Sequence, residues 1–268
     1  MSPETTYTHG HHESVLRSHR WRSAENSAGY LLAHLAPGQD LLDVGCGPGT
    51  ITRDLARRVA PGRVVGVDAS AEVVELARRD AVADDLGNVR FEVADVYALP
   101  FGDGAFAVVH AHQLLQHLSD PVAALKEMRR VCASGGIVAA RDADYATKAW
   151  YPPDPAFTRW LELYHAVARG NGAEPDAGRR LLAWAHAAGF GEVHASASAW
   201  CFATAQEREW WGTSWAERVL SSSFARQALE RGLTSRAELE SIADAWRRWS
   251  ADEDGWYATL NGEVICRP

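Results

Sequence analysis

Three glycines and two acidic residues have the spacing of a nucleotide-binding site. Gly45, Gly47 and Gly49 follow the short apolar run LLDV, and glycines at such a turn let main-chain N–H groups approach a ligand closely. Asp68 ends the next apolar run, roughly 20 residues farther on, where a carboxylate can accept both hydroxyls of a ribose. Asp95 ends the third run, at a position suited to an adenine amino group.

Two other glycine-rich motifs fit this turn less well. A dinucleotide-binding dehydrogenase requires G-x-G-x-x-G, but Thr50 occupies the last glycine position and Pro48 lies inside the turn. A P-loop requires a lysine that this region lacks. Asp43, at the end of the first run, either orders the loop or meets an ammonium group. Three acids without a phosphate-binding Lys or Arg favour a positively charged nucleoside over a pyrophosphate.

The elements that position these residues alternate between strand and helix. Alternation of this kind through residue 144 predicts right-handed crossovers and a parallel, doubly wound α/β sheet. A helix over about 14–35 precedes the first strand, and Ser70 and Asp120 are predicted to cap two of the later helices. The predicted strands are 40–45, 63–68, 88–95, 106–112 and 136–144, and the helices between them are 50–60, 70–83 and 119–132.

Beyond residue 145 the alternation becomes less regular. A Pro-led helix is expected over 150–170, a second helix over 176–190 and a strand over 192–204. Residues 206–254 have a helical pattern throughout, and the last segment indicates a strand pair or one long strand. We divide the chain into an N-terminal helical lid (1–38), a core (39–145) and a remainder (146–268) whose residues 206–254 form a helical cap.

Composition excludes several classes of protein. The 268 residues carry a net charge of −8, which disfavours nucleic-acid binding because that needs clustered Lys and Arg. The four cysteines form no CxxC pair, as expected for free thiols in a reducing cytosol. The histidines at 9–12 form no metal-like pattern, so no metal is expected. Without a signal peptide or an apolar span, we expect a soluble, cytoplasmic monomer or homodimer.

Five sequence blocks in order resemble the motif series of class I S-adenosyl-L-methionine (SAM)-dependent methyltransferases. They are LLDVGCGPGTIT, RVVGVDAS, VADVYALPF, FAVVHAHQLLQHLSDP and GGIVAARDAD. They are most similar to the subgroup that includes ubiquinone and menaquinone biosynthesis enzymes and many small-molecule methyltransferases. The resemblance implies SAM as cofactor and a Rossmann-like, mostly parallel seven-stranded sheet.

The resemblance also implies roles for residues at matching positions. In chain order these are Gly45 and Gly47 (methionyl part), Asp68 and Ala69 (ribose), Asp95 and Val96 (adenine), and His112 (methionyl part, through its backbone). Family members often carry an N-terminal helix that closes over the cofactor, which makes Tyr7, His11 and Arg22 candidate lid residues.

Methyl transfer from a sulfonium is an in-line displacement, so much of the enzyme's task is alignment in a water-poor site. A general base helps when the nucleophile is a hydroxyl, phenol or indole. His117 is a candidate base, although capping the next helix explains it equally well. Asp142, Asp144 and Tyr145 follow the fifth strand at the ligand-binding edge, although a surface pair between one of them and Arg141 explains them at least as well.

Ten of the eleven tryptophans lie in the second half of the chain. Most belong in a core, but the run EWWGTSW is denser than packing requires, so Trp211 and Trp215 are candidate acceptor contacts. Aromatic walls suit flat, apolar or cationic molecules. The sequence therefore predicts a methyltransferase for a small aromatic or hydrophobic metabolite in specialised metabolism. A quinone-pathway C-methyltransferase and a non-catalytic SAM-binding sensor remain alternatives.

Overall fold

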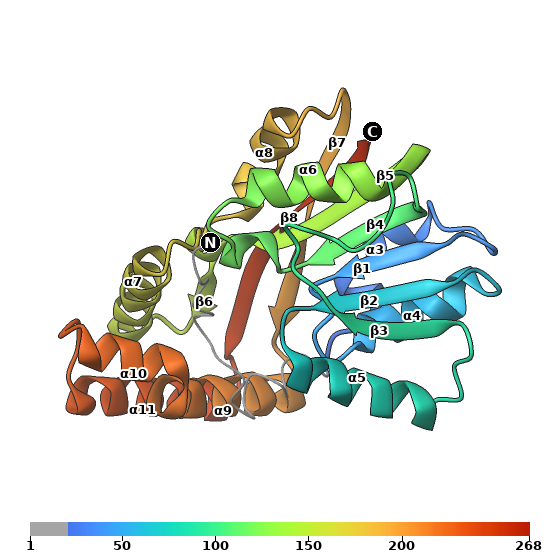
Figure 1. Ribbon diagram of the computed structural model, residues 1–268. Helices are drawn as coiled ribbons and strands as arrows, with labels where there is room; N and C mark the ends of the chain where they lie inside the picture. The colour runs from blue at the N-terminus through green and yellow to red at the C-terminus, as the bar shows by residue number, and fades with distance from the viewer. Residues whose placement is uncertain (1–20) are drawn as a thin grey trace.

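The computed structural model describes residues 21–268. The predicted lid residues Tyr7 and His11 and the histidine run at 9–12 lie outside this part of the chain. Within it, one mixed sheet of eight strands runs through the molecule (Figure 1). Five parallel strands form its first half: β1 (Leu41–Val44), β2 (Val64–Asp68), β3 (Val89–Val93), β4 (Phe106–His112) and β5 (Cys132–Ala143).

The second half of the sheet is antiparallel and centres on one long strand. β8 (Trp256–Arg267) pairs along one edge with β5 and with the short β6 (Ala149–Tyr151), and along the other edge with β7 (Glu192–Phe202). The strand order is therefore 3-2-1-4-5-8-7, with β6 added beside β8. The predicted mostly parallel sheet is confirmed. It has one strand more than the seven predicted because Ala149–Tyr151 pairs with β8 instead of beginning a helix.

Crossover helices cover both faces of the parallel strands. α4 (Thr50–Val59) and α5 (Ala71–Ala83) lie on one face, and α6 (Pro121–Val131) and α8 (Leu181–Ala187) pack on the other. The predicted caps are present, because the side chain of Ser70 accepts from Val73 N and that of Asp120 accepts from Ala123 N. The predicted helix over 176–190 is shorter and begins as the 3-10 turn η3 (Gly178–Arg180).

The chain before β1 differs from the single predicted helix. Its described part forms two short helices, α2 (Ala24–Ser27) and α3 (Gly29–Leu32). The break falls at Ala28, whose φ of −131° is not helical, beside a glycine that disfavours helix. Both helices pack with α4 on one face of the sheet.

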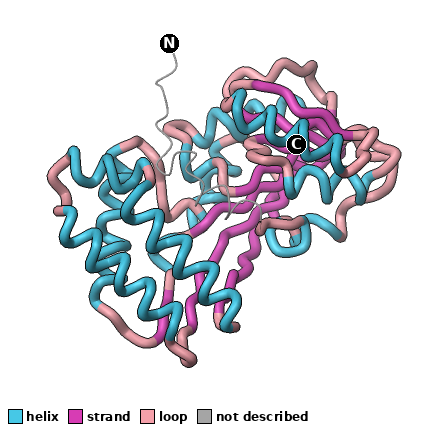
Figure 2. Tube along the Cα trace, turned by 90° about the horizontal axis from the view of Figure 1, so that it is seen from below, coloured by secondary structure: helices cyan, strands magenta, loops and turns pink. Residues whose placement is uncertain are grey.

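A group of helices extends the sheet at one end, as Figures 1 and 2 show. It consists of α7 (Pro155–Gly170), α9 (Ala205–Ser221), α10 (Ser223–Glu230) and α11 (Arg236–Ala251). The helical prediction for 206–254 is thereby confirmed. These helices share one aromatic core, centred on Trp160, Trp215 and Trp246, with β7 and β8. No helix of residues 21–268 has both the length and the apolarity needed to cross a membrane.

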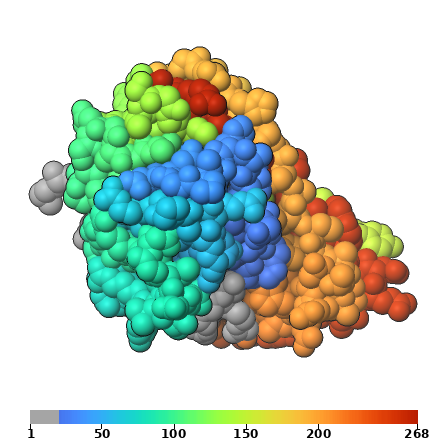
Figure 3. Space-filling view, turned by 90° about the vertical axis from the view of Figure 1, so that its right-hand side faces the viewer, coloured from blue at the N-terminus to red at the C-terminus, as the bar shows by residue number. Residues whose placement is uncertain are grey.

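The helical group is tied to the N-terminal segment. Trp200 of β7 donates its indole N–H to the carbonyl of Asn26 at 2.6 Å. The ring of Trp21 lies 5.3 Å from those of Trp200 and Trp210. On the face in Figure 3, the blue N-terminal segment accordingly borders the orange segment that contains β7 and α9.

Candidate active site

A cavity of about 390 Å³ opens at the carboxyl ends of the parallel strands. Its wall begins at the turn after β1, crosses the ends of β2 and β4, and continues through the turns η1 (Leu115–His117) and η2 (Tyr145–Thr147) to α9. The volume and the location are those of a small-molecule site in a doubly wound sheet. The predicted site residues that line it are Arg22, Gly45, Gly47, Asp68, Ala69, His112, His117, Tyr145, Trp211 and Trp215.

The turn after β1 has a backbone conformation that needs glycine. Gly45, Gly47 and Gly49 have φ values of +72°, +54° and +77°, in the left-handed region that other residues avoid. A Cβ on Gly45 would also lie 2.9 Å from Leu114 Cδ1. The turn thus presents main-chain atoms to the cavity without side chains in between.

Asp68 ends β2 at the cavity wall and has acceptor capacity left for a ligand. Its Oδ2 accepts from Gly47 N at 3.1 Å, and its Oδ1 accepts from Ser70 N at 3.0 Å. A carboxylate offers about four lone-pair sites, so two ribose hydroxyls can still donate to it. The two backbone hydrogen bonds fix the carboxylate in place before any ligand arrives.

Asp43 orders the loop, one of the two roles considered for it. It is 2 % exposed, and its carboxylate accepts from Thr52 Oγ1 at 2.6 Å. Its other oxygen lies 2.7 Å from Nδ1 of His110 on β4. These contacts connect β1 to α4 and β4 beneath the glycine turn.

Asp95 and Val96 do not line the cavity. β3 ends at Val93, so Asp95 lies in the following turn, where its side chain is exposed and accepts from Tyr97 N at 2.9 Å. Val96 packs on the core at the α6 side of the sheet. The adenine contact that the resemblance implies for this pair therefore has no counterpart in the cavity wall.

Arg22 brings a positive charge to the cavity wall near the end of β4. Its Nη2 donates to Oε1 of Gln113 at 2.5 Å. Gln113 has a positive φ of 50°, and its Nε2 donates to Oδ1 of Asn261 on β8 at 3.2 Å. Gln113, which the sequence did not indicate as a site residue, thus connects Arg22 to the sheet.

The two predicted catalytic residues lie at different depths. His117 lines the cavity, whereas Asp142 lies behind the wall and is fully buried. Oδ1 of Asp142 accepts from Gln116 N at 3.1 Å, so this carboxyl holds the turn that carries His117. Burial raises the pKa of Asp142 to about 7, against the opposing effect of the Gln116 and Leu115 backbone hydrogen bonds.

The surroundings of His117 make it a weak proton acceptor. Burial, and secondarily the charge of Arg22, lower the pKa of His117 to about 3. Its Nε2 lies 3.0 Å from Nε2 of Gln116. Because general-base catalysis works best when the pKa lies near the working pH, a neutral hydrogen-bonding role suits His117 better.

Aromatic side chains form the wall opposite the glycine turn. Trp211 and Trp215 of α9 are 6 % and 1 % exposed. Tyr145 stacks on Tyr164, with ring centroids 4.0 Å apart and an interplanar angle of 5°. The ammonium of Lys148, which follows η2, lies 3.9 Å from the centroid of the Tyr145 ring.

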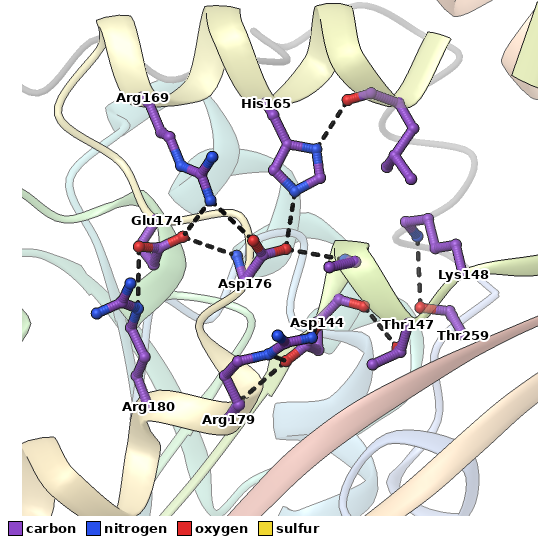
Figure 4. A network of polar contacts seen from close by, with 12 residues as sticks. Asp144, Thr147, Lys148, His165, Arg169, Glu174, Asp176, Arg179, Arg180 and Thr259 are labelled. Carbon is purple, nitrogen blue, oxygen red and sulfur yellow. Dashed lines mark hydrogen bonds and ion pairs between the residues drawn. The ribbon is translucent and has the colours of Figure 1, made fainter. Parts of the chain in front are cut away.

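A polar network holds η2 from behind (Figure 4). Oδ1 of Asp176 accepts from Ala146 N at 2.8 Å and lies 2.8 Å from Nε2 of His165. Asp144 accepts two hydrogen bonds from the Arg179 guanidinium, at 2.6 and 2.7 Å. This bidentate geometry and the Asp176 contacts fix the turn that carries Tyr145 and places Lys148.

Lys148 and Arg218 line the cavity, and the sequence analysis missed both. Lys148 is one of only two lysines in the chain and follows the fifth strand by five residues. Arg218 lies three residues after Trp215 and seven after Trp211, so all three share one face of α9. Extending the helical spacing of the EWWGTSW run by one turn could have indicated Arg218 as a site residue.

A family model described as "Methyltransferase domain" matches residues 35–212. An uncharacterised methyltransferase of Schizosaccharomyces pombe is 35 % identical over 270 residues, covering 97 % of this chain and 95 % of its own. The probable methyltransferase ltbC of Aspergillus luteorubrus is 32 % identical over 279 residues, which cover 97 % of this chain and 96 % of ltbC. The chain therefore belongs to the class I SAM-dependent methyltransferases and is an enzyme of that class.

Two further comparisons bear on the subgroup and the fold. The demethylmenaquinone methyltransferase of Lactococcus lactis is 34 % identical over 128 residues, 47 % of this chain and 48 % of that protein. The predicted resemblance to quinone-pathway enzymes is thus confirmed at a distance. The solved structure of the YcgJ protein of Bacillus subtilis shares the fold, with a TM-score of 0.57 and 20 % identity over 90 % of this chain and 97 % of that one.

Proposed function

We propose that this enzyme methylates a small aromatic or hydrophobic metabolite of specialised metabolism. One observation carries the proposal: a single cavity joins the glycine turn at Gly45 to the tryptophans of α9. A ligand at the turn and a second molecule against the tryptophans would therefore share one enclosed space, as transfer between them requires.

The glycine-turn end suits the cofactor. Backbone groups at Gly45 and Gly47 would meet the methionyl part, and Asp68, with Ala69 beside it, would hold the ribose hydroxyls. His112 and Arg22 would complete the methionyl end. When bound here, SAM supplies an activated methyl group, and the role of these residues is to orient it and exclude water.

The opposite end suits the acceptor. Trp211, Trp215 and Tyr145 would contact an apolar or aromatic body, and residues 206–254 would act as the cap that encloses it. His117 would donate or accept a hydrogen bond in its neutral form. Asp142 would act as a positioning residue, because it contacts the backbone of the η1 turn and not the cavity.

The two alternative functions predict different behaviour. A quinone-pathway C-methyltransferase would use the same cofactor end with a long prenylated acceptor. A non-catalytic sensor would leave no acceptor space, and the room beside the aromatic wall argues against it.

Cofactor binding and product mass test this function. S-adenosylhomocysteine should raise the melting temperature through binding linkage, and NAD should not. Incubation with SAM carrying an isotopically labelled methyl group and a panel of aromatic acceptors should give a product heavier by one labelled methyl group. Stabilisation by NAD alone, or no transfer to any panel member with S-adenosylhomocysteine binding intact, would contradict this function.

A further inference from the structure

Charge is distributed unevenly along the cavity. Among the described residues that line it, the acidic side chains are Asp43 and Asp68, both beside the glycine turn. The cationic side chains are Arg22, at the methionyl end, and Lys148 and Arg218 in the opposite wall, which has no acidic side chain from the described part of the chain. The strands that lead to the two ends, β1 and β5, are separated by β4, which sets them two strand spacings, about 10 Å, apart.

Lys148 has an unusual environment for a lysine. Its Nζ lies 3.9 Å from the centroid of Tyr145 and 5.6 Å from that of Tyr257. Its hydrogen-bond partner is Thr259 Oγ1 at the long distance of 3.4 Å (Figure 4). No carboxylate of residues 21–268 lies within ion-pair distance of it, so aromatic rings and one hydroxyl replace the counter-charge that buried ammonium groups need.

Arg218 places a second cation in the same wall. It is 4 % exposed, and its guanidinium carbon lies 4.6 Å from the centroid of Trp215. Burial and the charge of Arg218 lower the pKa of Lys148 to about 7, while Asp144 and Asp176 act weakly in the other direction. An anion that enters this cavity would offset the effect of Arg218 on Lys148 and stabilise the protonated ammonium.

We propose that the acceptor is a planar organic anion, an aromatic or conjugated molecule whose carboxylate or ionised phenol binds Lys148 and Arg218. This inference rests on the proposed function and adds the charge of the substrate. The tryptophans of α9 accommodate the ring, and the two cations select the acidic form. The inference concerns binding and orientation, and the transfer step itself is unchanged.

Matched probe pairs test the inference without turnover. Calorimetric titrations use protein saturated with S-adenosylhomocysteine, so that the cofactor's own carboxylate occupies its site. One pair is 2-naphthoate and 2-naphthamide, and the other is 4-nitrophenol, at a pH where it is ionised, and 4-nitroanisole. We expect at least one of the two anions to bind about tenfold or more tightly than its neutral partner, as for a hydrogen bond to a charged group.

Variants connect the preference to these side chains. Lys148→Met should remove most of the anion preference, whereas Lys126→Met, at the exposed lysine of α6, should leave it intact. Arg218→Gln gives a second test if Lys148→Met fails to fold. Equal affinities within both pairs, no binding of either anion, or full preference retained in both folded variants would overturn the inference. If S-adenosylhomocysteine still binds in those cases, the proposed function is unaffected. If wild-type protein does not bind S-adenosylhomocysteine, the proposed function itself is contradicted.

Discussion

At the glycine-turn end of the cavity, backbone conformation and the carboxylates of Asp43 and Asp68 form much of the wall, and residues 43–70 supply most of it, with Arg22 and His112 added from other segments. At the aromatic end, large side chains form the wall, and they come from Tyr145, Lys148, α9 and Thr259. The first end depends on positive φ angles and backbone hydrogen bonds, which one short segment sets by itself. The second depends on how a separate aromatic core packs. Substitutions should therefore alter binding alone at the first end, and stability together with acceptor choice at the second.

The largest effect is expected for Trp215→Ala, at the aromatic end. Trp215 is 1 % exposed and packs against Trp160 and Trp246. Its removal should lower the free energy of unfolding by about 3–5 kcal/mol, the usual cost of a large aromatic cavity. Urea denaturation followed by circular dichroism measures this. The exposed Trp256 provides the control, and its replacement by alanine should change stability by about 0.5 kcal/mol or less. If Trp215→Ala were as stable as wild type, Trp215 would serve the ligand and not the core.

Asp68→Ala should produce the next largest effect, and in binding only. Loss of hydrogen bonds to a charged group should weaken S-adenosylhomocysteine binding by about 1.5–3 kcal/mol. Isothermal titration measures it, with circular dichroism to verify folding. Asp95→Ala is the matched control, because Asp95 lies outside the cavity wall. If Asp95→Ala weakened binding as much as Asp68→Ala, the adenine contact implied by the resemblance would be right and the cofactor would extend beyond the cavity.

The same difference explains what the sequence could predict. The glycine turn, the Asp68 strand end and the caps at Ser70 and Asp120 depend on neighbours within a few residues, so their patterns are visible in the chain. The break at Ala28 is also local, but the apolar periodicity of 14–35 concealed it.

The aromatic end could not be predicted in the same way. Lys148 reaches the cavity because Asp144 and Asp176 fix the preceding turn, and Thr259 meets it only because β8 pairs with β6. The contacts of Asp144 and Asp176 join residues 30 to 35 positions apart, and the Lys148–Thr259 contact joins residues 111 positions apart. Helical spacing places Arg218 beside Trp215, but only the packing of α9 shows that this face borders the cavity.

A smaller effect is expected for Trp210→Ala, which tests the acceptor wall without opening the core. Trp210 is half-buried, lines the cavity and packs against Trp21. Its replacement should lower kcat/KM for the acceptor about 5–30-fold, equivalent to about 1–2 kcal/mol, with cofactor affinity unchanged. Trp184 of α8 is also half-buried but lies outside the cavity wall, so Trp184→Ala should leave kcat/KM unchanged. Parallel losses in both variants would indicate a general loss of packing.

The last prediction concerns Lys148 and the pH dependence of stability. Its pKa falls from the ordinary 10.5 to about 7 in the folded protein, so between these values the unfolded chain binds a proton that the folded one does not. Stability should therefore rise with pH across this window, and the full penalty applies below pH 7. Lys148→Met removes the penalty, so its stability relative to wild type should be greatest at about pH 6 and decline toward pH 10.

The difference in the free energy of unfolding between Lys148→Met and wild type isolates the contribution of Lys148 from those of other titratable groups. Arg218 on α9, Tyr257 on β8, Tyr145, and the more distant Asp144 and Asp176 face or influence this ammonium, and they are the same in both proteins. Lys126→Met is the matched control, because Lys126 is exposed on α6, and its difference should be flat with pH. Urea midpoints at several pH values give both curves.

A flat curve for Lys148→Met would mean that the ammonium keeps its ordinary pKa and is solvated, which would place the acceptor end in contact with bulk water. A declining curve would mean that the aromatic end holds its cation in a dry environment, where an acceptor anion binds most strongly.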